Sequence, residues 1–194
     1  MPTAPCYSER LDAAVAMAIQ DFRCIRRKGS TTPYLTHLFA VMSLVGEYGG
    51  DEDQLIAAVL HDWLEDIPGA KVAVLEERFG ARVAGLVGGL SDSVGHPKPP
   101  WRQRKERYLS HLRNAPAELK LISAADKVHN CAAIRRDLGE VGSAVFDRFT
   151  GGRDGTLWYY DEVALALAAN WSHPLARRIA LDAAGLRREA ELVG

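Results

Sequence analysis

The sequence has few cysteines and no excess of charge of either sign. Its 194 residues include three cysteines, none of them in a CxxC pair, which argues against a disulfide framework and a zinc ribbon and is typical of a reducing compartment. The 24 lysines and arginines nearly balance the 25 aspartates and glutamates, for a net charge of -1. No overall field therefore favours nucleic acid or a membrane surface as a partner.

Long apolar runs and a secretory signal are also missing. No apolar run approaches the roughly 18 residues that span a membrane. The first twenty residues contain Glu9 and Asp12 and lack the basic-then-apolar pattern of a signal peptide. We therefore expect a cytoplasmic protein with neither nucleic acid nor membrane as a partner, and the sequence leaves its oligomeric state open.

Strand-like alternation and internal repeats are absent as well. Apolar residues recur instead at the spacings of three and four that indicate helices, beginning with Leu11, Val15 and Ala18 after a plausible N-cap at Ser8. The expected helices cover residues 8–28, 34–48, 51–66, 71–79, 81–90, 101–113, 119–138, 141–149, 156–169 and 174–192. This pattern predicts an all-α fold, a single domain over residues 1–194 built as a helical bundle of about eight to ten helices. The Pro-rich segment 91–100 is expected to be a loop, either a lid or a plain connection.

One segment combines an apolar run with a dense group of ionisable residues. Residues 55–60 are apolar, and His61, Asp62, Glu65 and Asp66 follow within six positions. Burying a charge is unfavourable unless it is paired or bound to a metal. A helix through both parts is therefore a candidate active site.

On such a continuous helix, residues three and four apart share a face. His61 and Glu65 would lie along one line, and Asp62 and Asp66 along the neighbouring one. The first pair could then bind a metal, with two carboxylates one turn further on. Two ligands from one helix are too few for a tight site, so others must come from elsewhere.

Two further ionisable residues, His37 and Asp126, stand among apolar neighbours. With His61 and Asp62 they would form a mixed imidazole and carboxylate site, for which Mn²⁺ is the first choice and Fe or Zn are alternatives. Such an ion would lower the pKa of a bound water and polarise a phosphoryl oxygen. A carboxylate nearby could orient the water or accept its proton. Together, the metal and the carboxylate predict a phosphohydrolase.

The order His37, His61-Asp62, Asp126 resembles the HD-domain metal-dependent phosphohydrolases. More of the chain, from about residue 10 to 170, resembles one branch of them, the RelA/SpoT-type alarmone hydrolases with their small metazoan homologue. The matching pieces are Arg26-Arg27-Lys28 with Thr32-Pro33-Tyr34-Leu35-Thr36-His37, Ala57-Ala58-Val59-Leu60-His61-Asp62 with Glu65-Asp66, Phe79-Gly80 with Val83 and Leu86-Val87, and Ala125-Asp126-Lys127-Val128-His129-Asn130.

The resemblance implies an all-helical fold and a reaction on a small-molecule nucleotide, the removal of pyrophosphate from the 3′ position of ppGpp or pppGpp to give GDP or GTP. It implies that one Mn²⁺ is bound by His37, His61, Asp62 and Asp126. It also implies that Glu65 and Asp66 act on the attacking water, and that the nucleotide is bound by Arg27, Lys28, Asn130 and Tyr160. Since the chain ends at Gly194, without length for the synthetase and regulatory domains of the long members, a hydrolase-only protein is expected.

The chain departs from the family pattern at Leu38, where proline is usual, at Ile67, where threonine is usual, and at Ala132, where many members have an arginine. Loss of that arginine removes a possible phosphate contact. Two alternatives therefore stay open: an HD-type hydrolase acting on ppApp, NADPH or a 5′-nucleotide, and a non-catalytic alarmone-binding module.

The structural alternatives for single residues also stay open. Glu65 and Asp66 could form a solvated helix end, although acidic residues there oppose the helix dipole. Arg27 and Lys28 could complement a helix C-terminus, and the basic helix 101–113 could be a solvated face or could attract a polyphosphate or a partner protein.

Overall fold

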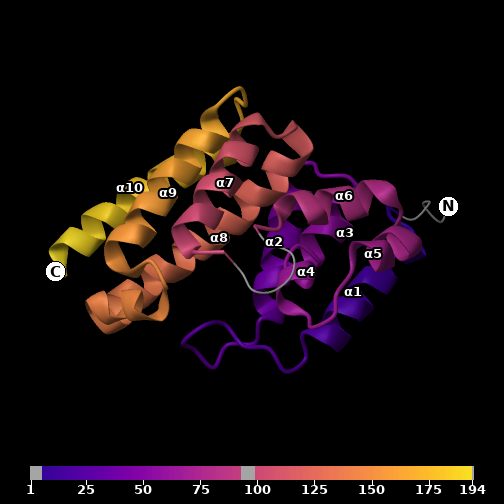
Figure 1. Ribbon diagram of the computed structural model, residues 1–194, viewed down its shortest axis with the longest axis horizontal. Helices are drawn as coiled ribbons and strands as arrows, with labels where there is room; N and C mark the ends of the chain where they lie inside the picture. The colour runs from indigo at the N-terminus through magenta and orange to yellow at the C-terminus, as the bar shows by residue number, and fades with distance from the viewer. Residues whose placement is uncertain (1–5, 93–98, 194) are drawn as a thin grey trace. The chain divides into compact units, whose positions relative to one another are not determined.

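The computed structural model describes residues 6–92 and 99–193, and within these ranges every regular element is a helix, apart from one isolated β-bridge between Arg26 and Pro33 (Figure 1). The all-α prediction is confirmed. Most of the predicted loop 91–100 lies outside the described residues. The helices group into two compact units, Met1–Val94 and Gly95–Gly194, each described by itself below. That residues 1–194 form a single domain stays a prediction.

The first unit contains helices α1 to α6, and α3 lies at its centre. Their bounds are α1 Glu9–Asp21, α2 Leu35–Glu47, α3 Glu52–Val59, α4 Trp63–Asp66, α5 Val72–Phe79 and α6 Ala81–Leu90. Helix α3 packs against α1, α2 and α6, which explains why Ile56 to Leu60 are all fully buried. An apolar run without a polar face is what a helix surrounded by other helices requires.

Side-chain caps and ion pairs fix the start of α3. Asp51 and Gln54 form a capping box, in which each side chain accepts a hydrogen bond from the backbone N–H of the other residue. Arg82 of α6 lies 2.8 Å from the Asp51 carboxylate, and its hydrogen bond holds the pKa of that carboxyl below the usual range. Arg10 of α1 pairs with Asp53 at 2.8 Å. Three helices are thereby tied together at one end of α3.

The predicted continuous helix over residues 51–66 is wrong, because α3 ends at Val59 and a turn follows before α4. In an unbroken helix the Ala58 carbonyl would accept from the Asp62 N–H. Here His61 Nδ1 lies 2.7 Å from that carbonyl oxygen instead. A side chain that competes for a backbone acceptor breaks a helix in this way, and sequence periodicity does not reveal it.

The first helix is also shorter than predicted, since α1 ends at Asp21 and not at Lys28. Phe22 is buried and stacks on Tyr34, with ring centroids 5.6 Å apart. The chain then returns on itself: the Arg27 N–H donates to Thr32 O at 2.8 Å. Arg27 and Lys28 therefore belong to a loop, and they do not complement a helix C-terminus.

The second unit contains α7 Trp101–Asn114, α8 Ala117–Val141, the 3-10 helix η1 Gly142–Arg148, α9 Gly152–Ala168 and α10 Pro174–Leu192. Helix α10 packs on α8 and α9, and α7 packs on α9. The predicted buried side of α7 is confirmed at Tyr108, Leu109 and Leu112. The Lys120 ammonium is buried and donates to the carbonyls of Arg113 and Ala169, and burial lowers its pKa.

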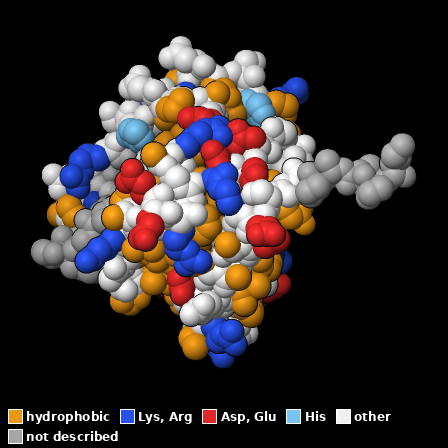
Figure 2. Space-filling model, turned by 90° about the vertical axis from the view of Figure 1, so that its right-hand side faces the viewer, with side chains coloured by type: hydrophobic (Ala, Val, Ile, Leu, Met, Phe, Trp, Pro, Cys, Tyr) orange, Lys and Arg blue, Asp and Glu red, His pale blue; other side chains and the backbone are white. Residues whose placement is uncertain are grey.

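Surface charge follows the balanced composition. On the face drawn in Figure 2, basic and acidic side chains are intermixed, in keeping with the net charge of -1. Among the described residues, none of the helices has both the length and the apolar character needed to cross a bilayer.

Candidate metal centre

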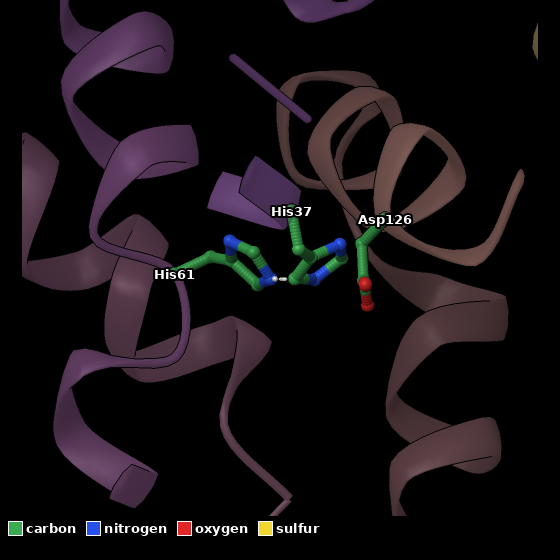
Figure 3. A group of neighbouring side chains, drawn as sticks. All are labelled: His37, His61 and Asp126. Atoms are coloured by element: carbon green, nitrogen blue, oxygen red, sulfur yellow. Dashed lines mark hydrogen bonds between the residues drawn. The ribbon is translucent and has the colours of Figure 1, made fainter. Parts of the chain in front are cut away.

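Two buried histidines face each other in the first unit. His37 comes from α2 and is fully buried, and His61 comes from the turn between α3 and α4 and is 3% exposed. Their Nε2 atoms lie 3.2 Å apart (Figure 3). Since His61 Nδ1–H donates to Ala58 O, the neutral ring of His61 presents a lone pair at Nε2. A lone pair that is fixed in this way on a buried imidazole is oriented to bind a metal ion.

Asp62 adds an oxygen to the two nitrogens. Its Oδ2 lies 2.9 Å from His61 Nε2 and 3.7 Å from His37 Nε2. Zn, Mg and similar ions bind nitrogen and oxygen at about 2.0–2.2 Å, so neighbouring ligand atoms around one ion lie roughly 3.0–3.5 Å apart. The three distances of the triangle, 2.9, 3.2 and 3.7 Å, lie within about 0.2 Å of this range, so small side-chain shifts would let all three atoms bind a single divalent ion.

The turn that breaks the helix is what makes this triangle. Short side chains of consecutive residues on a regular helix point in different directions, whereas His61 and Asp62 meet at 2.9 Å because the backbone leaves the helix at Leu60. We predicted that His61 would align with Glu65, and Asp62 with Asp66, along one helix. In the structure, His61 and Asp62 contact each other directly instead.

Tyr34 is a member of this cluster that had no predicted role. Its hydroxyl donates to Asp62 Oδ2 at 2.5 Å, and its ring meets the His37 ring edge-on, with centroids 5.4 Å apart. The available signal was its place three residues before His37 within a segment that matches the family. The Arg27 guanidinium lies over the same ring, 5.7 Å from its centroid, while Lys28 is exposed.

The two predicted catalytic carboxylates differ in their surroundings. Glu65 is half-buried, and its Oε1 accepts a hydrogen bond from the backbone N–H of Asp92 at 2.7 Å. Asp66 is exposed at the end of α4. Glu65 thus holds the segment that follows α6.

The remaining predicted residues lie in the second unit. Asp126 is buried on α8, where Lys127 Nζ and Asn130 Nδ2 each donate to one of its oxygens at 2.5 Å. Burial disfavours the charged form of Lys127, but the Asp126 carboxylate, with Tyr159 and Tyr108 nearby, holds the Lys127 pKa well above its usual range. Asn130 is predicted to contact a nucleotide, and in the structure it supports Asp126.

Tyr160 on α9 is also buried, at 5% exposure, and burial raises the pKa of its phenol well above the usual value. His37, His61 and Asp126, all buried, each offer a ligand atom of the kind that metal ions bind. As a set, these imidazoles and carboxylates suit a divalent metal.

Comparison with known proteins gives a family model and a group of relatives. The model of the HD domain matches residues 14–157. The guanosine-3′,5′-bis(diphosphate) 3′-pyrophosphohydrolase of Haemophilus influenzae is 35% identical over 109 residues, which cover 53% of this chain and 16% of that protein. The corresponding enzyme of Danio rerio, MESH1, is 33% identical over 115 residues, covering 58% of this chain and 62% of that protein. The chain thus spans less than two thirds of either relative.

A solved structure is similar over nearly the whole chain. It is that of a metazoan orthologue of SpoT, a protein that hydrolyses ppGpp and plays a role in starvation responses. Its sequence is 24% identical, the TM-score is 0.75, and the match covers 98% of this chain and 99% of that one. At this identity the likeness describes the fold.

Proposed function

Because this chain belongs to the HD domain family, we propose that it is a metal-dependent phosphohydrolase that removes pyrophosphate from the 3′ position of ppGpp or pppGpp. The observation that carries the proposal is the triangle of ligand atoms on His37, His61 and Asp62. It occurs in a chain similar to two proteins that are named 3′-pyrophosphohydrolases.

Under this proposal, His37, His61 and Asp62 hold one Mn²⁺, and Asp126 of the second unit is a further ligand. Asp126 is included for its place in the family pattern, the other three for their mutual geometry. Fe and Zn are alternatives, since both accept imidazole nitrogen. When bound, the ion lowers the pKa of a water and polarises a phosphoryl oxygen.

Two carboxylates act on the attacking water. The hydroxyl of that water forms a bond to the phosphorus attached to the ribose 3′ oxygen, the P–O bond to the ribose breaks, and a proton ends on the 3′ oxygen. Asp66, exposed at the end of α4, takes the proton from the water, while Glu65 orients the water and keeps its bond to the Asp92 N–H.

Basic side chains of the loop after α1 bind the polyphosphate. Arg27 offers the paired donors that match phosphate oxygens, and Lys28 is exposed beside it. Asn130 and Tyr160 are proposed as further nucleotide contacts on the basis of the resemblance. A cytoplasmic location is also part of the proposal, and the three scattered cysteines without a CxxC pair support it.

An endpoint assay tests the substrate and the metal together. The metal-stripped protein is incubated with ppGpp, pppGpp, ppApp, NADPH and dAMP, with and without Mn²⁺, and the products are separated by ion exchange. Pyrophosphate released from ppGpp only with Mn²⁺ supports the proposal. Orthophosphate from NADPH or dAMP, with ppGpp intact, keeps the metal chemistry and discards the alarmone. Nucleotide binding without turnover under every metal favours the non-catalytic module.

The roles of the two carboxylates are tested by Glu65→Gln and Asp66→Asn. The glutamine keeps an acceptor for the Asp92 N–H, so its effect reports on the charge of Glu65. Loss of a general base lowers turnover by about 10² to 10⁴-fold, which is the result expected for Asp66→Asn. If both variants hydrolyse ppGpp at the wild-type rate, the assigned mechanism is wrong.

A further inference from the structure

Tyr34 makes contacts with three residues that the proposed function uses. Its hydroxyl donates to Asp62 Oδ2 at 2.5 Å, its ring meets His37 edge-on at 5.4 Å, and the Arg27 guanidinium lies 5.7 Å from the ring centroid. All four residues belong to the first unit, and Tyr34 itself is half-buried at the N-cap position of α2.

The hydrogen bond to Asp62 leaves room for a metal on the same oxygen. A carboxylate oxygen has two lone pairs, so Oδ2 can accept from the phenol and still bind an ion. At 2.5 Å this is a short, charge-assisted O–H···O⁻ bond of the strong kind. Such a bond sets the direction in which the carboxylate points, and Asp62 needs this because its backbone lies in a turn and not in a helix.

The ring of Tyr34 is itself held in place. It stacks on the buried Phe22, with ring centroids 5.6 Å apart and planes inclined by 12°, and the Tyr34 N–H donates to Ile25 O at 2.9 Å. Phe22 and Ile25 flank the start of the loop that holds Arg27. The position of the phenol is thus tied to the loop through both its backbone and its ring.

We propose that Tyr34 is a positioning residue that supports two functions at once: its hydroxyl aligns Asp62 for the metal, and its ring supports Arg27 for the phosphate. The inference rests on the proposed function, since it assumes that Asp62 binds a metal and that Arg27 meets a phosphate. It predicts that the two contributions separate when the hydroxyl and the ring are removed one after the other.

Two variants make that separation. Tyr34→Phe removes the hydroxyl and keeps the ring, whereas Tyr34→Leu removes both. Tyr7→Phe, at an exposed tyrosine of the same unit, is the matched control. Mn²⁺ affinity is measured by calorimetry without nucleotide, kcat and KM for ppGpp are measured at saturating Mn²⁺, and circular dichroism verifies folding.

We expect Tyr34→Phe to bind Mn²⁺ about 10 to 100-fold more weakly, the usual effect of losing a residue that orients a ligand. Its KM at saturating Mn²⁺ should stay at the wild-type value. Tyr34→Leu should show the same loss of metal affinity together with a higher KM, and Tyr7→Phe should match the wild type. If Tyr34→Leu does not fold, Tyr34→Phe decides the metal part alone.

Wild-type Mn²⁺ affinity in Tyr34→Phe would overturn the inference and leave the proposed function standing. Conversely, if the wild-type protein binds Mn²⁺ but does not hydrolyse ppGpp, the proposed substrate fails, and the calorimetry still decides the role of the hydroxyl. A wild-type protein that binds no divalent ion overturns both.

Discussion

Two buried groups of ionisable residues, one in each unit, balance their charge differently. In the first unit, Asp62 lies against the imidazoles of His37 and His61 and receives one hydrogen bond from Tyr34. In the second unit, Asp126 is paired with the ammonium of Lys127 and the amide of Asn130. A neutral imidazole brings a lone pair, whereas lysine brings a positive charge. The first group therefore offers donor atoms of the kind that bind a metal ion, whereas the second group pairs its carboxylate with a cation of the chain.

The largest effect is expected when the first group loses a ligand. A bound ion stabilises the transition state of phosphate hydrolysis by several kcal/mol, so His61→Ala should lower ppGpp turnover by about 10³-fold or more and abolish tight Mn²⁺ binding. Turnover and calorimetry measure the two effects. The control is His111→Ala, an exposed histidine of α7. Turnover retained in His61→Ala would remove the first group as the metal centre.

Disrupting the second group should lower the free energy of unfolding. Lys127→Met leaves the Asp126 carboxylate buried without its cation, which destabilises a protein by about 3–5 kcal/mol. We expect a loss of that size in the free energy of unfolding at pH 7 in metal-free buffer, where the raised pKa keeps Lys127 charged in the wild type. Urea denaturation measures it against Lys71→Met, an exposed lysine. A loss below about 1 kcal/mol, the usual worth of a surface pair, would contradict the comparison.

Metal that binds the first group should stabilise the folded protein, by an amount that rises with the metal concentration. An ion that binds only the folded chain stabilises it by about 2.7 kcal/mol at a concentration 100 times its Kd. Mn²⁺ should therefore raise the Tm of the wild-type protein and leave that of His61→Ala unchanged. The same rise in both proteins would place the binding elsewhere.

The smallest effect concerns thiol reactivity, which sharpens the contrast between the units without touching activity. Cys6 and Cys24 of the first unit are exposed, whereas Cys131 on α8 is buried, and burial raises its thiol pKa to about 12. Because only the thiolate reacts, a thiol reagent at pH 8 should label Cys6 and Cys24 quickly and Cys131 only after unfolding. Equal labelling rates for all three in the folded protein would show that α8 is accessible.

Local rules were sufficient for much of the fold. The caps at Ser8 and Asp51, the glycine between α5 and α6 with its φ of 90°, and the buried side of α7 all follow from short-range chemistry that a sequence displays. The all-α class follows from the spacing of apolar residues. The residue types suited to a metal, His37 and His61-Asp62, were also visible, and the structure brings these three together.

The two misplaced helix ends share a physical cause, the action of a side chain on the backbone. Periodicity predicts a helix through Leu60, but the hydrogen bond of His61 to Ala58 O ends it. Apolar spacing also carries α1 past Asp21, but the stacking of Phe22 on Tyr34 turns the chain away. Tyr34 was missed for a different reason: the partner of its hydroxyl, Asp62, is 28 positions away in the sequence.

The turn at residues 60–62 has a consequence for protein engineering. Surface and helix-cap substitutions commonly stabilise a protein without changing its fold, and the four-residue α4 next to a broken α3 looks like a place to apply them. Straightening this stretch would return the Ala58 carbonyl to the Asp62 N–H and carry the imidazole of His61 away from the carboxylate of Asp62. Helix stability and the proposed metal site therefore oppose each other, because a regular helix here would separate the two proposed ligand atoms that now lie 2.9 Å apart.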